Sequence, residues 1–245
     1  MSDESMAGRI VIVTGGAGAI GSTVSRRWLD AGASVLVVDH RQATIDKWLA
    51  ATPNNWGKRI ATHAADVTRE EAANRMVAEA SHAFGTQPDT LIHLVGGFAM
   101  STAEDENAVR TWERMMSINL TSAFQCYRAV LPSMRSRGGG WIVALTSLAA
   151  AKPGARISAY AAAKSGLAAL TSSLSAEVKS AGIHVNLIVT STVDTPANRE
   201  SMGPENAPKW VSPDDIADAT FYLCSQQANS VYGASLEVLG KEQEC

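Results

Sequence analysis

The sequence predicts an α/β fold in which one doubly wound, seven-stranded parallel sheet is flanked by helices. Three observations predict this fold: short apolar runs alternate with segments of helix length, most runs are rich in Val, Ile and Leu throughout, and a glycine-rich turn follows the first run. Strands buried on both faces lose polar alternation, and helices between strands make the pairing parallel. The 245 residues, 46% of them hydrophobic, suffice for one large core, so we expect a single domain over residues 1–245.

Seven apolar runs predict the strands of the sheet, because each is short and is followed by a turn or by a helical segment. They span residues 9–14, 34–39, 59–65, 90–95, 141–146, 183–189 and 234–239. Right-handed crossovers bring the carboxyl ends of such strands to one edge, where doubly wound sheets bind ligands.

Five longer segments predict helices between these strands. They span residues 19–31, 69–84, 109–137, 158–181 and 213–225. The second follows Asp66 and has acidic residues in its first turn, and the fifth has Ser212 as its cap and Pro213 at its first position. Residues 190–212 form the longest irregular stretch, and long loops in compact domains are often binding loops or lids.

The turn after the first strand predicts a dinucleotide site. Gly16, Gly18 and Gly21 fit the G-x-G-x-x-G pattern, which gives a tight turn and a close approach of backbone to pyrophosphate at a helix N-terminus. Asp39 ends the second strand, where a carboxylate can bind the ribose 2′-hydroxyl of NAD. The alternative is a glycine turn without a ligand. The candidate cofactor contacts are Gly15, Gly16, Gly18, Ala19, Ile20, Gly21, Asp39, His40, Asp66, Val67 and Gly96.

The same region favours NAD over NADP. The carboxylate of Asp39 repels a 2′-phosphate, and the glycine turn itself carries no basic residue. Arg41 could pair with such a phosphate, which keeps NADP as the alternative, but it is also typical of a solvated residue at a helix start.

Tyr160 and Lys164 lie four residues apart in a small, apolar segment, so on a helix they share a face. A free tyrosine has a pKa of about 10. A lysine ammonium one turn away, together with the positive nicotinamide ring, should lower that pKa and make the hydroxyl a usable proton shuttle. This spacing also arises by chance, in which case the pair is surface packing.

With these residues in place, the chain resembles the single-domain branch of the short-chain dehydrogenase/reductase family over about residues 8–241. The turn reads TGGAGAIG, Ser147 in IVALTSLAA stands thirteen residues before Tyr160, and Asn119 lies in SINLTSAF. The resemblance implies a Rossmann fold and a catalytic tetrad of Asn119, Ser147, Tyr160 and Lys164. It also implies that Tyr160 and Lys164 contact the cofactor and that Thr195 contacts its carboxamide.

The resemblance implies an NAD(H)-dependent oxidoreductase that interconverts a secondary alcohol and a ketone. Tyr160 would act as the acid or base and Ser147 would bind the same substrate oxygen. Lys164 would tune Tyr160 and bind the nicotinamide ribose, and Asn119 would hold a water on Lys164. Two alternatives remain open: a catalytically silent dinucleotide-binding regulatory protein, and an NADH-dependent reductase of a pteridine-like ring.

The sequence departs from the family in four places. Ala19 replaces a glycine of the first turn, and Gly240-Lys241 replaces a glycine pair near the C-terminus. The family's Asn-Asn-Ala-Gly reads His93-Leu94-Val95-Gly96, which implies local repacking around a core histidine. The family's Pro-Gly reads Thr190-Ser191, which puts the backbone path beneath the nicotinamide in question.

Composition excludes several classes of function. The net charge of −3 argues against a nucleic-acid surface, the polar start MSDESMAG against a secretory signal, and the absence of long apolar stretches against a membrane span. Cys126, Cys224 and Cys245 have no metal-like spacing, so we expect reduced thiols, no metal site and a cytoplasmic location.

The substrate is expected to be a small-molecule alcohol or ketone held above the nicotinamide. The expected walls are mostly apolar: Gly97, Phe98, Leu148, Ala149, Arg156 and residues 195–210. Arg156 could hold an anionic substrate, although an exposed charge is the more common use of such a residue. The resemblance implies that the helices over residues 109–137 and 158–181 pair subunits, which makes a homodimer or homotetramer.

Overall fold

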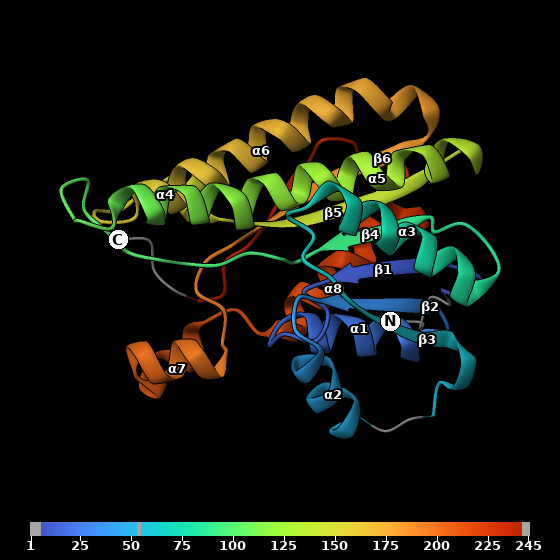
Figure 1. Cartoon of the computed structure of the whole chain (residues 1–245), viewed down its shortest axis with the longest axis horizontal. Coiled ribbons are helices and arrows are strands. Elements are labelled where there is room, and N and C mark those ends of the chain that lie inside the picture. The colour runs from blue at the N-terminus through green and yellow to red at the C-terminus, as the bar shows by residue number, and fades with distance from the viewer. Residues whose placement is uncertain (1–5, 53–54, 242–245) are drawn as a thin grey trace.

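The computed structural model describes residues 6–52 and 55–241, and over these residues seven parallel strands form one sheet (Figure 1). The strand order is β3-β2-β1-β4-β5-β6-β7, so the chain winds outward from β1 in both directions. The strands are β1 (Ile10–Thr14), β2 (Ser34–Asp39), β3 (Ile60–Ala64), β4 (Thr90–His93), β5 (Gly140–Ser147), β6 (Ile183–Thr190) and β7 (Ser235–Val238). The predicted fold class is confirmed. The direction of winding reverses between β1 and β4, which pair in parallel near the centre of the sheet.

Eight α-helices in the described part of the chain cover the sheet or extend from it. They are α1 (Gly21–Asp30), α2 (Gln42–Ala50), α3 (Glu70–Phe84), α4 (Ala108–Met116), α5 (Ser122–Ser136), α6 (Ser158–Val178), α7 (Pro196–Met202) and α8 (Pro213–Leu223). In Figure 1, α5 and α6 run across one face of the sheet, whereas α1 and α8 lie on the other.

Alternate residues of the central strands pack into two different cores. In β1, Val11 and Val13 pack with Trp28 of α1, whereas Ile12 packs with residues of α5 and α6 such as Tyr127 and Leu167. Successive side chains of a strand point to opposite faces, so a sheet covered on both faces needs apolar residues at nearly every position. This requirement explains the continuous apolar runs in the sequence.

The long helix predicted over residues 109–137 is wrong in one respect, because it is interrupted. A π-helical turn over Ser117–Thr121 separates α4 from α5. The side chain of Asn119, at the centre of this turn, donates to the carbonyl oxygens of Met115 (3.1 Å) and of the distant Gly97 (3.0 Å). The wider turn lets Asn119 face that loop, and π turns are frequent at functional sites.

Residues 190–212 are less irregular than the sequence predicts. β6 continues through Thr190, and α7 follows Thr195, whose hydroxyl accepts a hydrogen bond from the backbone N–H of Asn198 (3.2 Å). In Figure 1, α7 stands apart from the sheet. This helix buries none of its own residues, so apolar periodicity could not reveal it.

Cys126 and Cys224 are buried, unpaired thiols, and burial raises the pKa of both. Cys245 lies outside the described residues, as do the first five residues of the chain. No helix in the described ranges has the length and apolar character needed to cross a membrane.

Candidate active site

The glycine turn leaves no room for side chains at two of its positions. A Cβ on Gly16 would lie 2.7 Å from the carbonyl oxygen of Val13, and a Cβ on Gly21 would overlap the carbonyl oxygen of Gly15. Gly15 itself has a φ of 68°, which favours glycine. The turn can therefore bring its backbone close to a ligand at the N-terminus of α1, where Ile20 offers no capping side chain.

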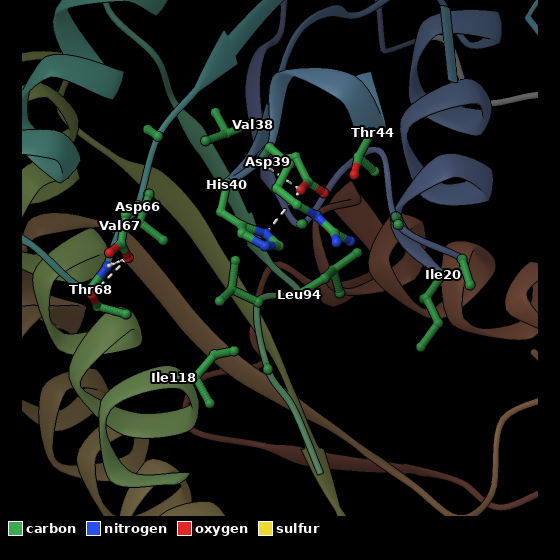
Figure 2. Close-up of a pocket in the computed structure, with 18 of the residues that line it drawn as sticks. Ile20, Val38, Asp39, His40, Thr44, Asp66, Val67, Thr68, Leu94 and Ile118 are labelled. Carbon is green, nitrogen blue, oxygen red and sulfur yellow. Dashed lines mark hydrogen bonds and ion pairs between the residues drawn. The ribbon is translucent and has the colours of Figure 1, made fainter. Parts of the chain in front are cut away.

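A cavity of about 730 Å³ opens beside this turn at the carboxyl edge of the sheet. Figure 2 shows Asp39, His40 and Thr44 on one side of the cavity and Asp66, Val67 and Thr68 on another. The predicted cofactor residues that line it are Gly15, Gly18, Ala19, Ile20, Gly21, Asp39, His40, Asp66, Val67, Gly96 and Thr195. Gly16, Tyr160 and Lys164 are not in its wall. The lining residues that the sequence did not predict as contacts are Val38, Thr44, Ala65, Thr68, Leu94, Val95, Arg114, Ser117 and Ile118.

Asp39 presents a nearly buried carboxylate to this cavity. One of its oxygens lies 3.2 Å from Nδ1 of His40 and accepts a hydrogen bond from the backbone N–H of Arg41 (3.4 Å). The side chain of Arg41 also lines the cavity, at the residue that precedes α2. The expected helix-start position of Arg41 is confirmed, and a carboxylate stands where a ribose hydroxyl could bind.

Tyr160, Ser147 and Lys164 meet at one point of the site. The side chain of Ser147 lies close enough to the Tyr160 hydroxyl to affect its pKa, and Nζ of Lys164 lies 6.0 Å from the centre of the Tyr160 ring. The same Nζ donates to the carbonyl oxygen of Leu145 (2.8 Å). A Cβ on Gly96 would lie 3.4 Å from this Nζ, so the group adjoins the cavity that Gly96 lines.

The pKa shifts of this group are set mainly by burial. Burial raises the pKa of Tyr160, and the nearby side chain of Ser147 offsets part of that rise. The lowered pKa predicted from the sequence requires the nicotinamide ring as well as Lys164, and in the protein without a cofactor burial has the larger effect on Tyr160. Burial also lowers the pKa of Lys164 from 10.5 to about 8.

Asn119 joins the group through backbone groups rather than through Lys164. Its Oδ1 accepts from the N–H of Gly97 (3.1 Å), and its Nδ2 donates to the carbonyl oxygens of Gly97 and Met115. The two amide hydrogens are therefore used, and Oδ1 alone keeps a lone pair for another partner. A Cβ on the neighbouring Gly96 would lie 2.9 Å from this Oδ1, so Asn119 fixes the loop beside Lys164.

His93 is a satisfied core residue, as expected. Its Nδ1 lies 2.9 Å from the hydroxyl of Thr14 and its Nε2 lies 3.2 Å from the hydroxyl of Ser122. Ser122 donates its single hydrogen to the carbonyl oxygen of Ile118 (2.7 Å), so Nε2 is the protonated nitrogen and Nδ1 accepts from Thr14. The family's asparagine pair is replaced by His93-Leu94 in this chain, and these hydrogen bonds are the local repacking that we expected around the histidine.

Acid pH is expected to destabilise the folded protein through His93. Burial, followed by the charge of Lys164, lowers its pKa from 6.5 to about 3. Between pH 6.5 and pH 3, His93 is protonated in the unfolded chain but stays neutral in the folded protein. The free energy of unfolding is therefore highest above pH 6.5 and decreases as the pH falls toward 3. The loss should be on the order of a few kcal/mol.

Urea unfolding of the wild type and of His93→Asn across that pH range measures this loss. The variant should show a shallower fall in the free energy of unfolding with acid, whatever its stability at neutral pH. His82→Asn, which changes an exposed histidine of α3, serves as the control. If the free energy of unfolding fell equally steeply with acid in the wild type and in His93→Asn, His93 would not be the source of the loss.

The rim of the site is apolar near Tyr160. Phe98 is 57% exposed, and its ring stands edge-on to the Tyr160 ring with the centroids 5.1 Å apart. Arg156 is exposed, with a φ of 64°, and its carbonyl oxygen accepts a hydrogen bond from the N–H of Ser101 (2.8 Å). Of the expected walls, Phe98 thus has an exposed ring beside Tyr160, and the backbone of Arg156 pairs with that of Ser101.

Comparison with known proteins extends this picture. The family model of the short chain dehydrogenases matches residues 9–206. A cis-4-hydroxycyclohexanecarboxylate dehydrogenase of Sinomonas cyclohexanicum is 31% identical, with 97% of each chain covered. A 7α-hydroxysteroid dehydrogenase solved with NADH and 7-oxo glycochenodeoxycholic acid has a TM-score of 0.89 at 26% identity, over 100% of this chain and 99% of the other. A 3-ketoacyl-(acyl-carrier-protein) reductase from Brucella melitensis, solved with NADH, has a TM-score of 0.85 at 25% identity, over 96% and 98%.

Proposed function

The chain belongs to the short chain dehydrogenase family, and from this premise we propose that it is an NAD(H)-dependent oxidoreductase that interconverts a secondary alcohol and a ketone. The observation that carries the proposal is the meeting of Ser147, Tyr160 and Lys164 beside a cavity of dinucleotide size. One domain would carry both the cofactor site and the substrate site.

The glycine turn and Asp39 fit a nicotinamide dinucleotide. The turn provides a cradle that a Cβ at Gly16 or Gly21 would fill, and Asp39 provides a carboxylate for the adenosine ribose. Val67 and Ile118 supply apolar walls for the adenine. When bound, the nicotinamide would accept a hydride from the alcohol or give one to the ketone.

Tyr160 moves the proton in this proposal. In reduction its hydroxyl donates to the carbonyl oxygen, and in oxidation its phenolate takes the proton of the alcohol. Ser147 donates a hydrogen bond to the same oxygen as charge develops there. Lys164 places a positive charge near the phenolate and binds the ribose, and Asn119 acts as a positioning residue that holds Gly97 and Gly96 beside Lys164.

We place the substrate among ring compounds with an apolar face. Two of the relatives are named for a hydroxyl or oxo group on a ring: a hydroxycyclohexanecarboxylate and a hydroxysteroid. The exposed ring of Phe98 beside Tyr160 supports the same class, because an aromatic edge packs well against a flat apolar surface. Purified protein with NADH should turn over cyclic ketones faster than acyclic ketones of equal carbon number. No turnover with any ketone or alcohol, despite cofactor binding, would favour a silent regulatory protein.

Asp39 should decide the preference for NAD. Replacing it by asparagine removes the charge that repels a 2′-phosphate and weakens the bond to the ribose 2′-hydroxyl. We expect Asp39→Asn to weaken NADH binding by about tenfold and to strengthen NADPH binding, as measured by fluorescence titration. Asp46→Asn, an exposed carboxylate of α2, is the matched control. An unchanged ratio of the two affinities would contradict the assignment.

A homodimer or homotetramer formed through α5 and α6 completes the proposal. A groove of about 250 Å³ lies between these helices on the outer surface, and Phe124 at its edge is 48% exposed. An exposed aromatic beside an apolar groove is typical of a subunit contact.

The buried, unpaired thiols Cys126 and Cys224 are consistent with a cytoplasmic location.

A further inference from the structure

Ser122 carries a fully buried hydroxyl directly after the π turn, and its hydrogen bonds point back toward that turn. The hydroxyl donates to the carbonyl oxygen of Ile118 (2.7 Å), and Nε2 of His93 lies 3.2 Å from it. We propose that Ser122, held by His93, is a positioning residue for the reaction, which keeps the π turn open and Asn119 in its place. This inference rests on the proposed function and adds two side chains that lie outside the wall of the cofactor cavity.

The backbone of the π turn explains why this hydroxyl is needed. In an α-helix the N–H of Ser122 would donate to the carbonyl oxygen four residues earlier, that of Ile118. Here this N–H donates to Ser117, five residues earlier, as a π turn requires. The Ser122 hydroxyl therefore offers the Ile118 carbonyl a donor in place of the backbone N–H. Without the hydroxyl, the α-helical bond would become the better partner for that carbonyl, and the turn would tighten.

His93 sets the direction of the Ser122 hydroxyl. Burial and the charge of Lys164 lower the pKa of His93 from 6.5 to about 3, so the ring is neutral at neutral pH and has one N–H. Because Ser122 gives its hydrogen to Ile118, that N–H is on Nε2, and Nδ1 accepts from Thr14 (2.9 Å). The bonds then run in one direction, from the end of β1 to the π turn, and hydrogen bonds in such a chain strengthen one another.

The turn that Ser122 holds is the one that presents Asn119 to the site. The amide of Asn119 pairs with both backbone groups of Gly97, at 3.1 Å and 3.0 Å. A Cβ on the neighbouring Gly96 would lie 3.4 Å from Nζ of Lys164, so this loop lies against the ammonium. A shift of Asn119 would therefore move the loop and change the surroundings of the charge that the reaction uses.

Hydrogen exchange at the Gly97 N–H tests the inference without relying on activity. This N–H donates to Oδ1 of Asn119, so its exchange reports where Asn119 lies. Ser122→Ala should speed exchange at Gly97 at least about tenfold more than at the core amides of β6, because the change is local. With NADH and a cyclic ketone, kcat should fall about five- to tenfold, the value of one neutral hydrogen bond.

Ser133→Ala is the matched control, because Ser133 is a buried serine of the same helix that donates to the carbonyl oxygen of Val130 (2.7 Å). It should change neither kcat nor the exchange at Gly97 relative to β6. At His93 the order of effects is also fixed. His93→Leu, which has no N–H, should lower kcat more than His93→Gln, whose amide can donate to the same oxygen. This order tests the inference if Ser122→Ala does not fold.

Each other result has a distinct meaning. Unchanged exchange at Gly97 in Ser122→Ala would overturn this inference and leave the proposed function standing. Equal effects of Ser122→Ala and Ser133→Ala would also overturn it, because the loss would then be one of general stability. If the wild type turned over no ketone or alcohol with NADH or NADPH, the proposed function would fail, and this inference with it.

Discussion

Tyr160→Phe is expected to lower kcat for ketone reduction by about 10²–10⁴-fold, the range for loss of a general acid. The variant loses the hydroxyl that Ser147 contacts but keeps a ring that can stand edge-on to Phe98. Because burial raises the pKa of Tyr160, the wild-type hydroxyl holds its proton at neutral pH and is in the form that reduction needs. Steady-state kinetics with NADH and a cyclic ketone measures the loss.

Two measurements keep this prediction specific. NADH affinity of Tyr160→Phe should stay close to that of the wild type, which shows that the site is intact. Tyr222→Phe, a change at an exposed tyrosine of α8, should leave kcat unaltered. If Tyr160→Phe kept more than about a tenth of the wild-type kcat, Tyr160 would not be the proton donor, since general acids contribute at least about 10²-fold.

Gly21→Ala should have the largest effect on cofactor binding. A Cβ at this position would overlap the carbonyl oxygen of Gly15 and lie 2.7 Å from Cα of Gly16, so the turn must open. Backbone cannot move aside as a flexible side chain can, and overpacking of this kind costs about 1–3 kcal/mol of stability. We expect a lower Tm and an NADH affinity reduced on the order of 100-fold, because the N–H groups at the start of α1 would be displaced.

Gly18→Ala is the matched control within the same turn. A Cβ on Gly18 would meet a single neighbour, the Gly15 carbonyl oxygen, at 3.2 Å, which a small adjustment relieves. Its NADH affinity should therefore fall by less than about tenfold. Calorimetry for Tm and fluorescence titration for NADH test the pair. Similar affinities for the two variants would show that the close approach at Gly21 does not shape the phosphate site.

The sequence could predict features that depend on local pattern. The apolar strands, the glycine turn and the order of Asn119, Ser147, Tyr160 and Lys164 are each readable along the chain. The short helix α2 is not among the predicted helices, although the sequence favours Arg41 as a helix-start residue, because α2 buries only Ile45 and Trp48 and its N-cap Arg41 makes no capping hydrogen bond with its side chain. The start of α7 did carry a signal, since Thr195 caps it and Pro196 follows, the same pattern that predicted α8.

Other features depend on contacts between distant segments. The π turn forms where Asn119 reaches Gly97, 22 residues away in sequence, and no local propensity encodes that contact. The upward shift in the pKa of Tyr160 depends on how deeply α6 packs, which spacing does not reveal. Whether the Ser122 hydroxyl meets His93 is likewise decided by segments that come together only in the folded protein.

The double hydrogen bond between Asn119 and Gly97 has a thermodynamic consequence. The chain leaves the sheet after His93, and the Asn119 amide then pairs with both backbone groups of Gly97, as an adjacent strand would. Conformational entropy of this segment is therefore lost when the protein folds rather than when a ligand arrives. Because this loop is already ordered, dinucleotide binding should lose little conformational entropy there. Calorimetric titration should therefore give a binding entropy that is only modestly unfavourable.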